Sequence, residues 1–119
     1  MTSLLIVDDN AAMRRLIKDL IAGLASSIYE CADGGQAIEI YEQFRPDLIL
    51  MDIEMAEMDG LTATRQIIAA HPETKIVMVT KYGSERLREA ARQAGACGYV
   101  LKENLMELRD LLASKLPQA

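Results

Sequence analysis

Four short apolar segments of this sequence each end in a residue that could take part in chemistry. The segments end in Asp8-Asp9, Asp52, Thr80 and Lys102. Taken singly, each residue has an ordinary structural explanation as a turn, a helix cap or a solvated charge. If the fold brings the four segment ends to one edge, they supply three carboxylates, one hydroxyl and one ammonium group to a shared site.

Three carboxylates held close together repel one another and raise one another's pKa unless a cation neutralises them. A hard cation is therefore expected. Mg²⁺ prefers oxygen ligands, keeps several waters and takes one or two protein carboxylates together with phosphate oxygens. Asp52 would then attack phosphorus as a nucleophile. Lys102 would supply positive charge and Thr80 a hydroxyl to the transferred phosphoryl group.

The segments that carry these residues are runs of Val, Ile and Leu, as in buried parallel strands. The expected strands are Leu4–Val7, Ile28–Cys31, Leu48–Met51, Ile76–Val79 and Tyr99–Leu101. Segments with apolar residues at helical spacing follow each of them. Their stripes comprise Met13, Leu16, Ile17, Leu20, Ile21 and Leu24; Ala37, Tyr41 and Phe44; Leu61, Thr64, Ile67 and Ile68; Leu87, Ala90, Ala91 and Ala94; and Leu105, Leu108, Leu111 and Leu112.

This alternation predicts an α/β fold: a doubly wound (βα)₅ domain with a five-stranded parallel sheet. The order expected for its strands is the flavodoxin-like 2-1-3-4-5, one of the common doubly wound orders. Ligands of such sheets bind outside the carboxyl ends of the strands, where the polar residues fall. Gly23 and Gly95 are expected to end helices. Asp33 with Gln36, and Asn104 with Glu107, have the spacing of caps at helix starts.

The bulk properties favour one cytoplasmic domain over residues 1–119, without repeats or linkers. The 13 basic and 18 acidic residues give a net charge of −5, which argues against direct binding to nucleic acid. No apolar run approaches the roughly 20 residues needed to cross a membrane, and the first residues lack the basic region of a signal peptide. His71 is assigned no role.

The two cysteines are expected to be reduced, packed thiols. In the predicted strand order, Cys31 and Cys97 lie on or beside opposite edge strands. Four strand spacings of about 4.8 Å would then separate them by roughly 19 Å, which is beyond the reach of a disulfide.

The motifs also have a specific resemblance. The segments Leu4–Asn10, Leu48–Met55, Met58–Gly60, Val79-Thr80 and Gly95–Lys102 resemble, in order and spacing, those of the response-regulator receiver family over essentially the whole chain. The resemblance implies that Asp52 accepts a phosphoryl group from a histidine kinase or a histidine phosphotransfer protein. It implies that Asp8 and Asp9 are the acidic pair at Mg²⁺, with Asp52 and the backbone carbonyl of Glu54 as further ligands. Thr80 and Tyr99 match the family's switch pair.

Three positions depart from the family pattern. Lys81 stands where a small residue is usual, and its side chain could either extend into solvent or fold over the phosphoryl group. Ala56 replaces a frequent proline in the loop after Asp52. Glu103 replaces a proline that often follows a cis peptide; because a non-proline cis bond costs about 2.5 to 4 kcal/mol, a trans bond is expected. Glu54 and Tyr82 occupy variable positions that tune the lifetime of the acyl phosphate.

Three alternatives remain open. A phosphatase of the haloacid-dehalogenase type shares the nucleophile and the metal. That family has the motif Asp-x-Asp at its nucleophile, with the second Asp as acid and base, whereas here Glu54 stands two residues after Asp52. A degenerate receiver could act only as a binding module. A flavin or nucleotide binder would need glycines and free amides after the first strand, where Asp8-Asp9-Asn10 would repel a phosphate. The output partner is not indicated, and the chain could be a stand-alone receiver or an excised domain.

Overall fold

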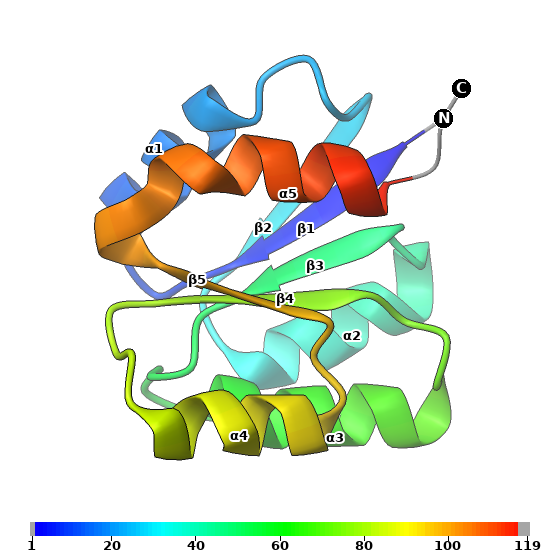
Figure 1. The fold of residues 1–119 in the computed structure, drawn as a ribbon. Coiled ribbons are helices and arrows are strands. Elements are labelled where there is room, and N and C mark those ends of the chain that lie inside the picture. Colours follow the sequence, from blue (N-terminus) through cyan, green and yellow to red (C-terminus); the bar gives the residue numbers. More distant parts are fainter. Residues whose placement is uncertain (1, 117–119) are drawn as a thin grey trace.

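The computed structural model describes residues 2–116, in which strands and α-helices alternate, with a 3₁₀ helix before the last α-helix (Figure 1). Its elements are β1 (Ser3–Val7), α1 (Ala11–Leu20), β2 (Ser27–Cys31), α2 (Gly34–Phe44), β3 (Leu48–Met51), α3 (Gly60–Ala70), β4 (Ile76–Thr80), α4 (Glu85–Ala94), β5 (Gly98–Leu101), the 3₁₀ helix η1 (Lys102–Glu107) and α5 (Leu108–Lys115). The predicted strands are confirmed to within one residue at each end.

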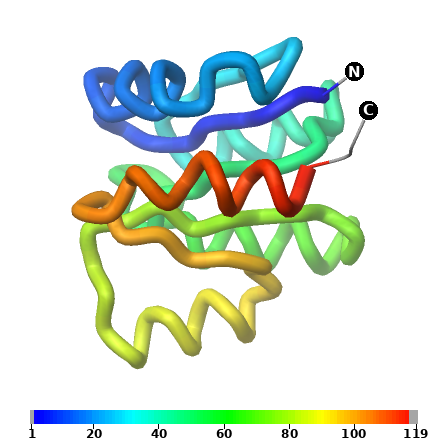
Figure 2. The backbone as a smooth tube through the Cα atoms, turned by 45° about the horizontal axis from the view of Figure 1, so that its top comes forward, coloured from blue at the N-terminus to red at the C-terminus, as the bar shows by residue number. Residues whose placement is uncertain are grey.

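All strand pairs are parallel, and the strand order is β2-β1-β3-β4-β5, as predicted. Helices α1 and α5 cover one face of the sheet, and α2, α3 and α4 cover the other (Figures 1 and 2). The alternation of side chains along β1 serves both layers. Leu4 and Ile6 pack with the α1 and α5 residues, while Leu5 and Val7 pack with those of α2, α3 and α4.

Side-chain caps set the starts of four helices. Asn10, Asp33, Asp59 and Ser84 each accept a hydrogen bond from the backbone N–H three residues later, which satisfies an amide that has no partner within the helix. The predicted cap at Asp33 is therefore confirmed. The predicted cap at Asn104 is wrong: this residue lies inside η1 with φ −123° and ψ 37°, and α5 begins after Glu107 without a side-chain cap.

The two glycines expected to end helices differ. Gly95 ends α4 in the left-handed conformation, with φ 110°. Gly23 also has a positive φ, of 89°, but it lies in the turn after α1, whose C-cap is Ile21. The last part of the predicted α1 stripe therefore continues into a turn, where Ile21 is buried and Leu24 still packs against the core.

Two residues of the predicted apolar stripes lie at the surface. The exposed fractions of Leu16 and Phe44 are 44% and 46%. Phe44 stacks on Tyr29 of the edge strand β2, with ring centroids 4.6 Å apart. Phe44 therefore packs at the edge of the sheet, and helical spacing alone did not distinguish either residue from a core position.

The cysteines are both free thiols and belong to opposite edges of the sheet, as predicted. Cys31 is buried, and burial raises the pKa of its thiol to about 11. Cys97, by contrast, is exposed, so the expectation that both thiols are packed is wrong for this residue. It precedes β5, an edge strand that has a neighbour on one side only.

None of the helices in residues 2–116 combines the length and the apolar character required to cross a membrane.

Candidate functional site

The acidic residues meet because β1 and β3 are neighbours in register. Val7 pairs with Met51, so Asp8 and Asp52 leave the sheet side by side. The Asp52 N–H donates to the Val7 carbonyl at 2.9 Å, which extends the sheet pairing to the phosphorylation candidate itself. One carboxylate oxygen from each of Asp8, Asp9 and Asp52 lies within 4.8 Å of the others. The predicted carboxylate trio is thus assembled.

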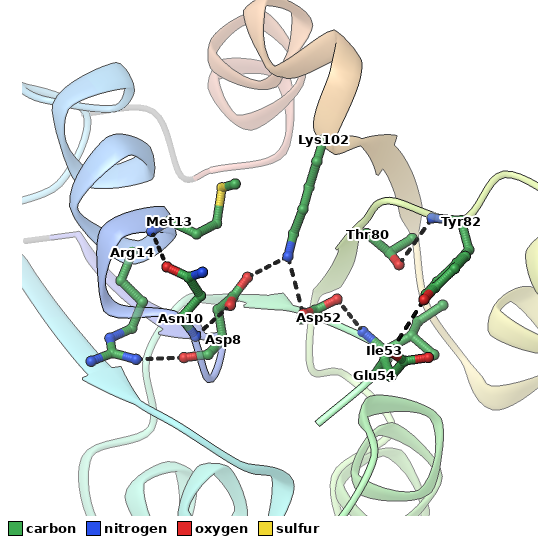
Figure 3. A network of polar contacts seen from close by, with 10 residues as sticks. All are labelled: Asp8, Asn10, Met13, Arg14, Asp52, Ile53, Glu54, Thr80, Tyr82 and Lys102. Atoms are coloured by element: carbon green, nitrogen blue, oxygen red, sulfur yellow. Dashed lines mark hydrogen bonds and ion pairs between the residues drawn. The ribbon is translucent and has the colours of Figure 1, made fainter. Parts of the chain in front are cut away.

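Lys102 enters the same site from the end of β5 (Figure 3). Its Nζ lies 2.8 Å from Asp8 Oδ2 and 3.1 Å from Asp52 Oδ2. Asp8 and Asp52 are buried, with exposed fractions of 1% and 6%. The single ammonium group therefore bridges two carboxylates that water scarcely reaches.

Burial and charge act against each other at this centre. Loss of hydration raises the pKa of Asp52; the Lys102 ammonium opposes this effect, and the Asp8 carboxylate adds to it. For Lys102, burial lowers the pKa, but the hydrogen bond to Asp8 and the charges of both aspartates raise it above its ordinary value. Lys102 is therefore positively charged at neutral pH, and its attraction supports the ionised form of Asp52.

The loop after Asp52 is held against the end of β3. Asp52 Oδ1 accepts a hydrogen bond from the Ile53 N–H at 2.8 Å, and the Gly60 N–H donates to the Ile53 carbonyl at 2.7 Å. A Cβ atom at Gly60 would lie 1.9 Å from the Asp52 carbonyl oxygen, so no residue with a side chain fits there without moving the backbone. The close approach of α3 thus fixes the loop that follows Asp52, the predicted nucleophile.

A pocket of about 430 Å³ opens over the carboxylates. The residues that line it are Asp8, Asp9, Asn10, Asp52, Glu54, Met55, Ala56, Lys81, Tyr82 and Lys102. Its floor carries the oxygen donors that Mg²⁺ prefers, and its volume leaves room for water and phosphate oxygens. Asp8 Oδ2 is buried and, among the described residues, its polar contact is Lys102. These residues fit a hard divalent cation.

Thr80 lies at the predicted strand end but is fully buried and does not line the pocket. Its Oγ1 accepts a hydrogen bond of 3.4 Å from the Tyr82 N–H. The Tyr99 hydroxyl donates to the Tyr82 carbonyl at 2.6 Å, and the Arg88 guanidinium lies 4.7 Å from the centroid of the Tyr99 ring. The backbone of Tyr82 therefore contacts both members of the predicted switch pair.

The three departures from the family pattern are now placed. Lys81 is exposed and lines the pocket, and its Nζ lies 5.3 Å from the centroid of the Tyr82 ring. Among the described residues, it forms no ion pair with Asp52. Ala56 is an exposed residue of the pocket wall. The bond before Glu103 is trans, as expected, because residues 2–116 contain no cis peptide.

Other contacts were not foreseen from the sequence. The Tyr82 hydroxyl donates to Glu54 Oε1 at 3.2 Å across the pocket rim. Asn10 donates its N–H to Asp8 Oδ1 at 2.9 Å. Arg14 donates from its guanidinium to the Asp8 carbonyl. The only sequence signal for Arg14 is its place in the first turns of the helix that follows the acidic pair.

His71 lies outside this site, at the end of α3 that precedes β4. Its Nε2 is 2.8 Å from Glu42 Oε1 and its Nδ1 is 3.2 Å from an Arg45 guanidinium nitrogen. These contacts give it a structural place in the connection between α3 and β4.

Comparison with known proteins agrees with this geometry. A family profile described as "Response regulator receiver domain" matches residues 4–113. The chain belongs to the response regulator receiver family. This receiver domain is 40% identical over 100 residues to the chemotaxis protein CheY of Bacillus subtilis, with 83% of each chain covered. It is 36% identical over 99 residues to the chemotaxis protein CheY of Thermotoga maritima, with 82% of each chain covered.

A solved structure supports the fold of the receiver domain independently. The chain is similar to a DNA-binding response regulator of the LuxR family from Staphylococcus aureus, with a TM-score of 0.86 and 29% identity. The superposition covers 96% of this chain and 98% of that one. The predicted resemblance and the predicted fold are both confirmed.

Proposed function

We propose that this receiver domain is a phosphoryl-accepting switch of a two-component signalling system, with Asp52 as the acceptor. One observation carries the proposal: the buried Asp52 carboxylate is held between Lys102 and two further carboxylates at the floor of a pocket. The donor would be a phosphohistidine on a kinase or on a phosphotransfer protein. Asp8, Asp9, Asp52 and the backbone carbonyl of Glu54 would hold Mg²⁺, which neutralises the charge of the incoming phosphoryl oxygens when bound.

The chemistry follows from the placement of the chain's own groups. A carboxylate oxygen of Asp52 forms a bond to phosphorus, and the bond between phosphorus and the donor imidazole nitrogen breaks. The second nitrogen of the donor ring carries a proton, so the ring leaves with the electron pair of that bond as a neutral imidazole. Lys102 lies within hydrogen-bond reach of Asp52 Oδ2 and is placed to contact the phosphoryl group once the Asp52 carboxylate has become an acyl phosphate, a mixed anhydride. Its charge then stabilises the transferred phosphoryl oxygens in a water-poor site.

The signal would leave the site through the backbone of Tyr82. A phosphoryl oxygen that draws the hydroxyl of Thr80 would disturb the bond between Thr80 and the Tyr82 N–H. Since the Tyr82 carbonyl also accepts from Tyr99, this disturbance would reach the surface near α4 and β5. We propose an output protein or output domain as the reader of this surface.

One observation favours a switch over a phosphatase. A phosphatase of the aspartyl-phosphate type needs a free acid two residues after its nucleophile, but here Glu54 accepts the Tyr82 hydroxyl at the exposed rim. We therefore propose that the protein acts on its own phosphorylation state and does not turn over phosphate esters. The net charge of −5 and the free thiols agree with a cytoplasmic protein that contacts neither nucleic acid nor membrane directly.

The test is phosphorylation by acetyl phosphate and by a phosphohistidine donor in the presence of Mg²⁺, followed by intact-mass measurement. The wild type should gain one phosphoryl group that hydroxylamine removes, and Asp52→Asn should gain none. Asp19→Asn, which removes an exposed carboxylate of α1, is the matched control and should label as the wild type does. Labelling of Asp52→Asn at the wild-type rate would refute the assignment, and continuous release of phosphate with many turnovers per chain would favour the phosphatase.

A further inference from the structure

Asp9 is the least constrained of the three carboxylates. Asp8 and Asp52 are buried and hydrogen-bonded, whereas Asp9 is exposed. Within residues 2–116, the Asp9 carboxylate takes part in no hydrogen bond or ion pair, although one of its oxygens lies within 4.8 Å of ligand oxygens from Asp8 and Asp52. The direction in which this carboxylate leaves the chain is therefore set by the backbone of the loop between β1 and α1.

That backbone is held at the peptide that joins Asp8 to Asp9. The Arg14 guanidinium donates from one terminal nitrogen to the Asp8 carbonyl oxygen at 2.5 Å (Figure 3). The Asp8 N–H donates to the Cys31 carbonyl of β2 at 3.1 Å. Because both sides of Asp8 are hydrogen-bonded, the plane of the following peptide cannot rotate without breaking the bond to Arg14.

Arg14 is itself anchored to the same strand. Its Nε lies 3.1 Å from Glu30 Oε1, and Glu30 is the β2 residue that precedes Cys31. Hydrogen bonding by Lys18, together with that by Arg14, holds the pKa of Glu30 below its ordinary value, so the anchor is an anion at neutral pH. A planar guanidinium can bond to Glu30 and to the Asp8 carbonyl simultaneously, which a lysine ammonium cannot do in the same geometry.

We propose that Arg14 is a positioning residue for the divalent cation: the Glu30–Arg14–Asp8 connection orients the Asp8-Asp9 peptide and so places the Asp9 carboxylate for binding. This inference rests on the proposed function, because it takes the carboxylate trio to be the metal site. Partners behind the direct ligands of a metal commonly alter its affinity tenfold or more. Arg14 is expected to act at the lower end of that range.

The direction of the effect separates positioning from simple electrostatics. Arg14 is a cation beside a cation site, so loss of its charge alone would tighten Mg²⁺ binding. Loss of a positioning contact would weaken it. The two explanations therefore predict changes of opposite sign in the same measurement.

The experiment is an Mg²⁺ titration of the full chain without any phosphodonor, followed through the backbone amide signals of Asp9 and Asn10 by NMR. Arg14→Gln is expected to weaken Mg²⁺ binding about tenfold. Arg14→Lys keeps the charge but loses the planar guanidinium that bonds to two acceptors simultaneously. Its affinity for Mg²⁺ should lie between those of Arg14→Gln and the wild type. Lys18→Gln is the matched control, because Lys18 pairs with the same Glu30 at 2.9 Å without touching Asp8, and it should bind Mg²⁺ as the wild type does.

The outcomes are separable from those of the proposed function. If the wild type shows no Mg²⁺-dependent shift at these amides, the metal site of the proposed function fails. If the wild type binds Mg²⁺ but Arg14→Gln binds it equally or more tightly, or if Lys18→Gln weakens binding as much, the positioning role alone is overturned. Should Arg14→Gln not fold, Arg14→Lys decides alone, because it keeps the charge and loses the guanidinium geometry. Weaker Mg²⁺ binding than in the wild type would then support the role, and unchanged binding would overturn it.

Discussion

Replacing Asp52 by asparagine is expected to stabilise the metal-free fold, although it removes an ion pair. At an effective dielectric constant of 20, the attraction of Asp52 for Lys102 at 3.1 Å is worth about 5 kcal/mol. Repulsion from Asp8, within 4.8 Å, opposes it by at least about 3.5 kcal/mol, and repulsion from the water-screened Asp9 adds about 1 kcal/mol. These contributions nearly cancel, so the cost of burying the Asp52 charge decides the sign, in agreement with the raised pKa of this carboxyl.

The expected gain is about 1 kcal/mol, or a rise in Tm of about 3 to 6 °C for a domain of this size. Asparagine keeps the shape of the side chain, and Lys102 keeps its contact with Asp8 at 2.8 Å. The assay is thermal unfolding at pH 7 with EDTA, followed by circular dichroism. Glu39→Gln, which neutralises an exposed carboxylate in the middle of α2, is the control and should leave Tm unchanged.

The pH dependence tests the cause. Because the pKa of Asp52 is raised in the folded state, the folded protein holds this proton at a pH where the unfolded chain has lost it. Wild-type stability therefore falls as the pH rises from the ordinary range of an aspartate through the raised pKa. The advantage of Asp52→Asn should be complete at pH 7 and vanish below that range. An Asp52→Asn protein less stable than the wild type at pH 7 in EDTA would show that the attraction of Lys102 outweighs burial and repulsion, and would refute this reasoning.

Three further outcomes are expected. Asp9→Ala should abolish Mg²⁺ binding while leaving the fold intact; unchanged affinity in a Mg²⁺ titration would remove this carboxylate from the metal site. Lys81→Ala should speed labelling by acetyl phosphate, because removal of the side chain opens the phosphoryl site. It should change the lifetime of the acyl phosphate by less than about tenfold, because an exposed charge rarely contributes the corresponding 1.4 kcal/mol. A larger decrease of the lifetime would place Lys81 in the active site. Exposed Cys97 should react with a thiol reagent at pH 8 in the folded protein. Cys31, which is buried and whose pKa is raised to about 11, should not react. Equal reactivity of the two thiols would contradict the burial of Cys31.

The strand ends could be predicted because the signal for them is local. Apolar runs such as Leu48–Met51 are interrupted abruptly by a charged residue, and parallel strands direct all their carboxyl ends to one edge of the sheet. The convergence of Asp8, Asp52 and Lys102 follows from that rule once the strand order is known. The helix start at Asp33 could be predicted for the same reason, since a cap is a contact over three residues.

By itself, then, the sequence determined the alternation of elements, the carboxylate trio and the opposing lysine. The tertiary structure decided what depends on the packing of distant segments: the complete burial of Thr80, the Tyr82 backbone between Thr80 and Tyr99, and the exposure of Cys97. The spacing of Asn104 and Glu107 suggested a cap that the turn out of β5 does not form. Local pattern specifies which groups a strand end presents, whereas burial and hydrogen-bond partners depend on neighbours from other elements, which no short stretch of sequence contains.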